Sequence, residues 1–309
     1  MQLRKKNGIK TEWNCSISIK MSIFVPTKGI TDMKKTLHIG DNASWEGCMK
    51  LSMHGLAPKD SYAIMGFDYS FCTACLPRNL SREELKRCIS GSHTHLCQDL
   101  VLRFADIDLR AFDKVVIWHT YDSNSLLLLY FFSSIVEGDL YHCLIVGDDD
   151  MKWTGGATPE NLQDGFERIK LLTDEERTLF NEIYSSLLGT ECIPKIADRE
   201  QIICKSKEFI KSLLLKHLTK TPKPYARVVG ETISEFPKEY LFDPMYLDCL
   251  ILEMIEDGDL KPLRIRRDNS KKPYPIGGFY NRKYLYKGED MGDWYDFSVV
   301  KKEDVNNNK

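Results

Sequence analysis

The sequence predicts an α/β domain with a mostly parallel sheet flanked by helices, followed by a helical connection and a winged-helix-like module. Short apolar runs alternate with helical stretches from residue 36 onward, which favours parallel strands joined by crossover helices. The chain of 309 residues is long enough for two domains of ordinary size. Its composition, 42% hydrophobic and 28% charged with a formal net charge of -2, excludes disorder, collagen and a coiled coil as descriptions of the whole chain.

The first 35 residues are basic and lack the apolar periodicity of a folded core. Eight Lys and Arg residues stand against two acidic residues in this segment. We expect a basic extension over residues 1–35, after which a strong strand signal begins. Met33 is a candidate start of the folded protein, and a protein that begins there is expected to fold.

Residues 36–150 form the predicted α/β domain. Its strand candidates are 36–39, Tyr62 to Phe67, Lys114 to Trp118 and Leu140 to Val146. The helical stretches that separate them lie near 44–54, 81–109 and 122–136. Ligands of such sheets bind outside the carboxyl ends of the strands, so the residues directly after each strand are the first candidates for a site.

A helical connection is expected over residues 151–220, with helices near 174–188 and 198–218. Thr173 followed by three acidic residues is typical of a helix N-terminus, where free N–H groups need acceptors. The turn at 221–224 contains two prolines and ends the connection, because proline removes a backbone donor.

The predicted winged-helix-like module covers residues 221–300. Its helices are expected at Tyr225 to Glu235 and Pro244 to Glu256, and a strand at Lys261 to Arg266 follows. Two further apolar strands, Tyr284 to Tyr286 and Phe297 to Val300, could close a hairpin. Residues 301–309 are expected to be a disordered tail.

Several short motifs give the chain a family resemblance. The segment from His38 to Lys50 matches, at five positions, a motif of the form H-I-x-x-G-D-S-x-x-G-x-L-K. The retained residues are His38, Ile39, Ser44, Gly47 and Lys50. The Gly-Asp pair of that motif is replaced by Asn42-Ala43, while Gly40-Asp41 lies two residues earlier.

Further matches are Asp68-Tyr69-Ser70, Val116-Ile117-Trp118-His119, Arg227-Val228-Val229-Gly230 and the helix from Tyr246 to Leu260. On these residues the chain resembles two bacterial families known as domains of unknown function 1835 and 3658. The resemblance covers about residues 36 to 265. It implies the fold and the pairing of the two domains, and no activity is assigned to the families.

The strand ends supply the candidate ligand site. The candidate ligand-binding residues are Asn42, Ser44, Asp68, Ser70 and His119. A simpler role as helix caps or satisfied turns stays open for each of them. Catalysis would use His119 with Ser44 or with Asp122, since histidine titrates near neutral pH and can serve as a base.

Ten cysteines without an export signal are interpreted as intracellular thiols, and the chain as cytoplasmic and without a membrane segment. Cys72 and Cys75 form a Cys-x-x-Cys pair, and His93 and Cys97 follow at a spacing that a zinc site permits. Isolated thiols are the simpler interpretation, so no metal site is favoured. The acidic run Asp148 to Asp150 is typical of a solvated loop.

The segment Lys261 to Lys287 is strongly basic, with nine Lys and Arg residues against one acidic residue and with interleaved tyrosines. Its candidate nucleic-acid contacts are Arg264, Arg266, Arg267, Lys271 and Lys272. The preceding predicted helix is acidic, which would repel phosphates, so packing of this segment against the protein's own acidic surface is the alternative.

The sequence therefore predicts a protein that binds a small ligand or nucleotide at the strand ends of its α/β domain, with the last module mediating regulatory contacts. One alternative is a hydrolase or transferase that uses His119. The other is a DNA-binding regulator that uses the basic segment. Zinc is the only cofactor that the residues suggest, and the sequence does not indicate the oligomeric state.

Overall fold

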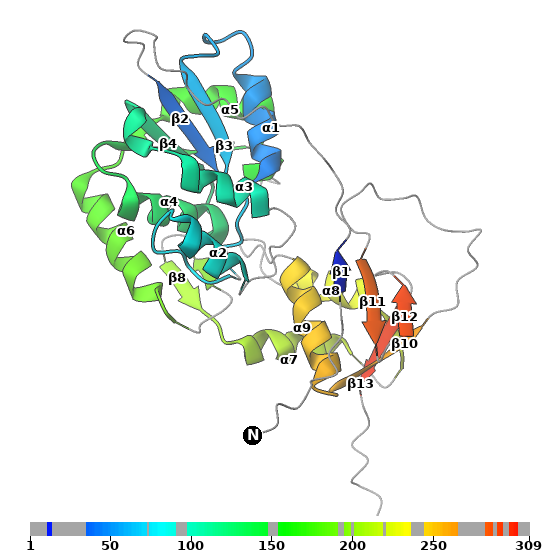
Figure 1. Cartoon of the computed structure of the whole chain (residues 1–309). Helices are drawn as coiled ribbons and strands as arrows, with labels where there is room; N and C mark the ends of the chain where they lie inside the picture. Colours follow the sequence, from blue (N-terminus) through cyan, green and yellow to red (C-terminus); the bar gives the residue numbers. More distant parts are fainter. Residues whose placement is uncertain are drawn as a thin grey trace, which may run out of the picture. The chain divides into compact units, whose positions relative to one another are not determined.

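The chain folds into two compact units (Figure 1). The computed structural model describes residues 11–13, 35–72, 74–90, 98–147, 154–190, 195–198, 201–218, 221–235, 244–264, 282–286, 289–292 and 297–301. The first unit, here called the α/β unit, comprises Thr27–Lys207 and Phe236–Asp243. The second, here called the terminal unit, comprises Met1–Pro26, Glu208–Glu235 and Pro244–Lys309.

The α/β unit is built on a five-stranded sheet with the strand order β3-β2-β4-β5-β6. Its strands are β2 (Thr36–Gly40), β3 (Tyr62–Gly66), β4 (Lys114–His119), β5 (Leu140–Leu144) and β6 (Lys170–Leu171). Strands β3, β2, β4 and β5 run parallel to one another, and β6 pairs antiparallel with β5 at the edge. The predicted α/β fold with its mostly parallel sheet is thus confirmed, and each of the four predicted strands is present within two residues of its expected bounds.

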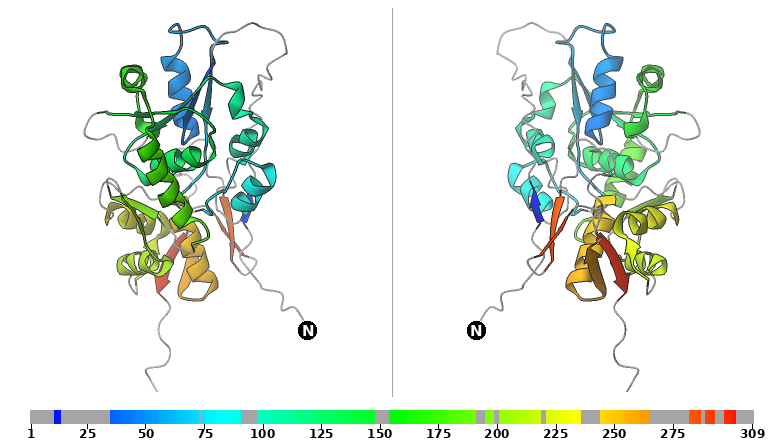
Figure 2. Two further views of the ribbon diagram at one scale, coloured as in Figure 1. Left: turned by 90° about the vertical axis from the view of Figure 1, so that its left-hand side faces the viewer. Right: turned by 90° about the vertical axis from the view of Figure 1, so that its right-hand side faces the viewer.

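Helices cover both faces of this sheet, because β4 presents apolar side chains to both sides. Val116 and Trp118 pack against one group of helices, whereas Val115 and Ile117 pack against another. The first group is α1 (Ala43–Ser52) and α5 (Pro159–Gly165). The second is α2 (Arg82–Ser90), α3 (Gln98–Leu102), α4 (Ser123–Ile135) and α6 (Asp174–Leu187). Figure 2 shows α1 on one side of the strands and α2 and α3 on the other.

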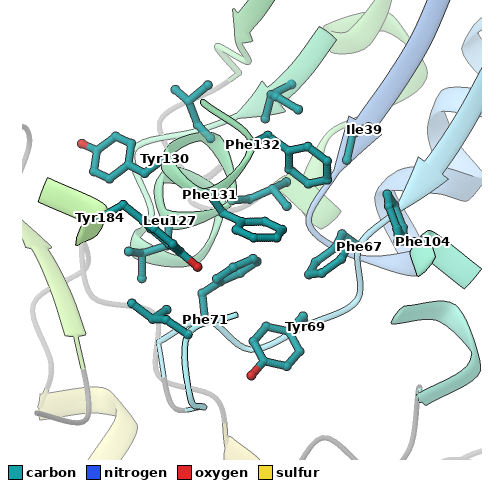
Figure 3. Packing of buried hydrophobic residues seen from close by; sticks show 14 of the residues in the cluster. Ile39, Phe67, Tyr69, Phe71, Phe104, Leu127, Tyr130, Phe131, Phe132 and Tyr184 are labelled. Atoms are coloured by element: carbon teal, nitrogen blue, oxygen red, sulfur yellow. The ribbon is translucent and has the colours of Figure 1, made fainter. Parts of the chain in front are cut away.

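An aromatic cluster fills the larger of the two cores (Figure 3). Phe67 contacts Phe104 edge-on, with 4.7 Å between the ring centroids, and also contacts Phe71 and Phe131. These rings come from the segment after β3, from a 3-10 turn and from α4, and all are fully buried. Burial of each such side chain stabilises the fold by about 1.5–3 kcal/mol.

Two predicted helices differ from the structure. The expected helix over 81–109 is broken into α2, α3 and the 3-10 turns η2 (Arg103–Asp106) and η3 (Leu109–Ala111). The expected helix over 198–218 begins instead with a two-stranded antiparallel pair, β7 (Lys195–Asp198) and β8 (Gln201–Cys204), before α7 (Lys207–His217). Residues 201–204 are Gln-Ile-Ile-Cys, and their β-branched isoleucines suit a strand. The remaining 3-10 turns are η4 (Thr154–Gly156) and η5 (Phe166–Arg168).

In the part of the chain that the structure describes, the terminal unit has three helices and two small antiparallel sheets. After α7 its helices are α8 (Tyr225–Glu235) and α9 (Pro244–Glu256), which have the predicted bounds. One sheet has the order β10-β13-β9, from β10 (Leu260–Arg264), β13 (Phe297–Lys301) and β9 (Lys223–Pro224). The other has the order β1-β11-β12, from β1 (Thr11–Trp13), β11 (Arg282–Tyr286) and β12 (Glu289–Gly292).

Strand pairing corrects two expectations about this unit. The hairpin expected between Tyr284–Tyr286 and Phe297–Val300 does not form, since β11 pairs with β12 and β1, and β13 pairs with β10 and β9. Residues 11–13 of the expected basic extension form β1, so these residues belong to a sheet. The expected tail after Lys301 lies outside the described residues.

The expected helical connection over 151–220 is divided between the units. Helices α5 and α6 belong to the α/β unit, whereas residues 208–217 of α7 belong to the terminal unit. Cys204, at the end of β8, is disulfide-bonded, so the interpretation of every cysteine as a thiol is wrong for this residue. Within the described ranges, the helices are all too short or too polar to cross a membrane.

Candidate functional site

Polar side chains gather at the carboxyl edge of the parallel sheet, where three strand connections meet. Asp41 and Asn42 follow β2, Asn124 opens α4 after β4, and Thr154 lies in η4 after β5. The carboxylate of Asp41 accepts hydrogen bonds from Asn42 Nδ2 at 2.6 Å, from Asn124 Nδ2 at 3.3 Å and from the hydroxyl of Thr154. Asn42 Nδ2 also donates to Thr154 Oγ1 at 2.8 Å. The cluster of Asp41, Asn42, Asn124 and Thr154 is here called the strand-edge cluster.

Helix caps hold this cluster in place. Asn42 caps α1, because its Oδ1 accepts from the backbone N–H of Trp45 at 2.8 Å. Asp122 caps α4, because its Oδ1 accepts from the backbone N–H groups of Asn124 and Ser125 at 2.9 and 3.0 Å. Asn124 in turn accepts from the backbone N–H of Phe71 at 2.7 Å, which ties the segment after β3 to the cluster.

Burial strongly perturbs Asp41, the acid of the strand-edge cluster. Its side chain is buried, with 4% of the residue exposed. Burial, together with the negative charge of Asp122, raises the pKa of Asp41 to about 7, although the hydrogen bonds from Thr154, Asn124 and Asn42 oppose the change. Asp41 therefore changes its charge close to neutral pH.

Two glycines allow backbone segments to approach the cluster closely. A Cβ atom at Gly66, the last residue of β3, would lie 2.3 Å from the backbone oxygen of Asn42. A Cβ atom at Gly155 would lie 2.9 Å from Asn42 Oδ1. Only glycine permits this packing, so the edge is fixed on two sides of Asn42.

A buried ion pair fixes the start of α1 against β3. Glu46 accepts hydrogen bonds from Arg103, from Lys50 Nζ at 2.5 Å and from the backbone N–H of Gly66 at 2.7 Å. Arg103 also donates to the carbonyl of Gly66 at 2.8 Å. Burial opposes ionisation of Glu46, but the hydrogen bonds from Arg103, Lys50 and Gly66 outweigh it and lower its pKa. This acid is therefore a charged structural brace.

His119, the candidate base, lies in a different network. Its Nδ1 donates to the carbonyl oxygen of Thr120 at 3.0 Å, since a carbonyl oxygen can only accept. Its Nε2 then accepts from Nδ1 of His142 at 3.0 Å, and the two rings stack with an interplanar angle of 16°. Burial, together with the neighbouring histidine, lowers the pKa of His119 to about 4. His119 is thus a neutral, buried residue with both ring nitrogens engaged.

The structure separates the remaining candidates. Ser44 is exposed on the first turn of α1, and the ring nitrogens of His119 bond to Thr120 and His142 instead, so the expected nucleophile–base pair is not formed. Asp122 is a helix cap that also accepts from Thr120 Oγ1 at 2.5 Å, and no hydrogen bond joins it to His119. Asp68 and Ser70 are half-buried in the segment directly after β3.

Asn42 is thus the predicted ligand residue that the structure brings into the strand-edge cluster. Asp41, Asn124 and Thr154 were not predicted. Asp41 lies two residues after the end of the predicted strand 36–39, and this position was a signal that could have identified it. Thr154 is 113 residues from Asp41 in the sequence, so their contact depends on the tertiary fold.

The cysteine and basic candidates receive no support as sites. Cys72 is buried, and Cys75 contacts Arg87 and Cys88, whereas His93 and Cys97 lie outside the described residues. Among the residues described here, no group of three or more His, Cys, Asp or Glu side chains is arranged to hold a metal ion. Arg264 lies on β10, and the other basic candidates and the acidic run at 148–150 fall outside the described ranges; they are Arg266, Arg267, Lys271 and Lys272.

Comparison of the chain with known protein families and with curated proteins gives no match to either.

Proposed function

We propose that the α/β unit binds a small polar ligand, with a nucleoside or nucleotide as the first candidate, at the carboxyl ends of β2, β4 and β5. The observation that carries this proposal is the strand-edge cluster, in which side chains from three separate connections converge on the carboxyl group of Asp41. In parallel α/β sheets this edge is where ligands bind.

The energetic state of Asp41 supports a functional role. A carboxyl group that must ionise while buried destabilises the fold, and no Lys or Arg is among its hydrogen-bond partners in the described structure. Glu46, which is similarly buried, has two basic partners and a lowered pKa. Perturbed acids that lack a compensating cation concentrate at functional sites.

The chemistry of the cluster indicates the type of ligand. Carboxyl and amide oxygens accept hydrogen bonds from hydroxyl and amino groups, as the ribose and base of a nucleoside provide. Asn42, Asp68 and Ser70 are half-buried at the same edge and are the residues that such a ligand would reach. The proposed ligand contacts are therefore Asn42, Ser44, Asp68 and Ser70. Asp41 accepts a hydrogen bond from Asn42 and so holds its side chain in place.

Native mass spectrometry of the purified protein, followed by thermal-shift titration with nucleosides and nucleoside monophosphates, tests the proposal. We expect one compound class to raise the melting temperature of the wild-type protein, and Asn42→Ala and Asp68→Asn to weaken this effect. Asp113→Asn is the matched control, because Asp113 precedes β4 at the opposite edge of the sheet and accepts from the backbone of Lys35. Binding that is equally weakened by Asp113→Asn, or no binding of any compound, would contradict the proposal.

We also propose that the terminal unit is a winged-helix-like module whose partner is a protein. The order α7, β9, α8, α9, β10, β13 and the sheet order β10-β13-β9 support this assignment, since a winged helix combines three helices with such a sheet. Helix α9 carries Glu253 and Glu256, and Glu253 pairs with Lys211 at 3.0 Å. Acidic residues on the helix that would enter a DNA groove disfavour phosphate contact.

Fluorescence anisotropy with a DNA duplex at low salt distinguishes the two partners of this module. We expect no salt-sensitive binding. Binding that is lost in Arg266→Ala and Arg267→Ala would instead establish the basic segment as a nucleic-acid contact. No arrangement in the described structure favours a hydrolase or transferase, because both ring nitrogens of His119 are already engaged.

A further inference from the structure

Two cysteine sulfur atoms in the α/β unit share one arginine side chain. Arg87 Nη1 donates to Cys75 Sγ at 3.1 Å, and Arg87 Nη2 donates to Cys88 Sγ at 3.3 Å. The Cys75 side chain is close enough to the Cys88 thiol to raise its pKa. Neither cysteine is disulfide-bonded. The two thiols therefore lie near each other and share one guanidinium group.

The positions of the two cysteines differ in a way that suits sequential oxidation. Cys88 lies on the core side of α2 and is fully buried, whereas Cys75 is half-buried in the loop before α2. Burial, together with the neighbouring Cys75, raises the pKa of Cys88 to about 12, so that Cys88 remains a thiol at neutral pH. Cys75 is thus the sulfur that a small oxidant in solvent reaches first.

The arginine is held rigidly in this position. Glu84, one turn earlier on α2, accepts from Arg87 Nε at 2.9 Å and from Arg87 Nη2 at 2.8 Å. Glu84 also accepts from the backbone N–H of Arg78 at 2.9 Å. The guanidinium group is therefore a fixed hydrogen-bond donor to both sulfur atoms.

We propose that Cys75 and Cys88 are a reversible redox pair that hydrogen peroxide converts into a disulfide. In the first step the sulfur of Cys75 attacks one peroxide oxygen, the O–O bond breaks, and Cys75 becomes a sulfenic acid while water leaves. In the second step the sulfur of Cys88 attacks Cys75, the S–O bond breaks, and the released hydroxide takes the proton of Cys88 to form water. The two sulfurs together lose two electrons, and the peroxide gains them.

The loop that carries Cys75 also reaches the strand-edge cluster. The backbone N–H of Phe71 donates to Asn124, which donates to Asp41. A disulfide from Cys75 to α2 would therefore restrain the segment that holds Asp68 and Ser70. An effect on ligand binding rests on the proposed function, whereas formation of the disulfide does not.

The test is a peptide map of the full-length protein after peroxide treatment. The reduced protein is treated with hydrogen peroxide, remaining thiols are blocked with an alkylating reagent, and trypsin is added. Trypsin releases residues 60–78, which contain Cys72 and Cys75, and residues 88–103, which contain Cys88 and Cys97. We expect these peptides to be joined, and the joined species to disappear on reduction with a dithiol.

Four single variants assign the bond. We expect the joined peptides to be lost in Cys75→Ser and Cys88→Ala and retained in Cys72→Ser and Cys97→Ser. Cys75 is half-buried, so Cys75→Ser keeps the test valid even where the Cys88 variant does not fold. Joined peptides that persist in Cys75→Ser, or no joined peptides in the wild-type protein, would overturn the proposal. We further expect Arg87→Gln to slow disulfide formation, with Arg82→Gln as the control on the same helix.

Discussion

The substitution Asp41→Asn is expected to stabilise the α/β unit increasingly as the pH rises. The pKa of Asp41 is about 7 in the folded protein against 3.8 for the free side chain. Because the pKa is raised on folding, the stabilising state is the protonated one, and stability is lost as the pH rises from about 4 through about 7. The difference of about 3 pKa units corresponds to a loss of about 4 kcal/mol at high pH.

The asparagine side chain removes this loss but introduces a local cost. Its oxygen can still accept from Asn42 and Thr154, whereas its amino group faces Asn124 Nδ2, where Asp41 accepted at 3.3 Å. This opposition of two donors costs about 1–3 kcal/mol at every pH. The quantity to measure is therefore the change with pH, and we expect the stability difference in favour of the variant to grow by about 3 kcal/mol between pH 5 and pH 8.

Urea unfolding at pH 5, 6, 7 and 8, followed by tryptophan fluorescence, measures this difference. Trp45 and Trp118 are fully buried in the α/β unit and report on its unfolding. Asp139→Asn is the control, because it removes one acid from an exposed position after α4. A difference between Asp41→Asn and wild type that stays constant from pH 5 to pH 8 would refute the reasoning.

Three further substitutions test other parts of the site. Burial lowers the pKa of His142 to about 4, so between pH 6.5 and pH 4 only the unfolded chain takes up a proton at this residue and the folded protein loses stability. His142→Gln should therefore reduce this loss of stability by about 3 kcal/mol. Acid titration followed by circular dichroism measures the change. Arg103→Met should cost about 1.5–3 kcal/mol, because Glu46 keeps Lys50 but loses its more buried partner. Adding Glu46→Gln should recover much of this loss in urea unfolding, and additive effects would contradict the pairing. Gly66→Ala should cost at least about 1–3 kcal/mol because its Cβ would meet backbone, whereas the control Gly47→Ala, with open space around it, should stabilise α1 by up to about 1 kcal/mol.

The sheet could be predicted from the sequence because its strands are apolar on both faces. Val115 to Trp118 is a continuous apolar run, and such runs are typical of strands covered by helices on each side. The first residues of α8 and α9 could be predicted because a proline turn precedes α8 and Pro244 opens α9. The segment 81–109 was different, because the prediction continued one helix across Gly91 and Ser92, although a glycine directly after Ser90 is typical of a helix end.

The strand-edge cluster was only partly predictable. A polar residue after a strand identifies the edge, but the sequence does not show which side chain turns inward. Asn42 was predicted from its capping position, while the burial of Asp41 depends on Thr154, which lies more than a hundred residues away. The pairing of His119 with His142 rather than Ser44 is likewise set by the neighbouring strand β5.

The contrast between Asp41 and Glu46 supports the proposed role of Asp41 in ligand binding. Both carboxyl groups are about 4% exposed and lie on either side of the β2–α1 turn. Glu46 has Arg103 and Lys50 as partners, so its charge is compensated and its pKa is lowered. Asp41 has only neutral donors and the nearby charge of Asp122, so its ionised form is destabilising. A neutral side chain at position 41 would fold at least as well at neutral pH, and ligand recognition by this carboxyl group would account for the presence of the acid.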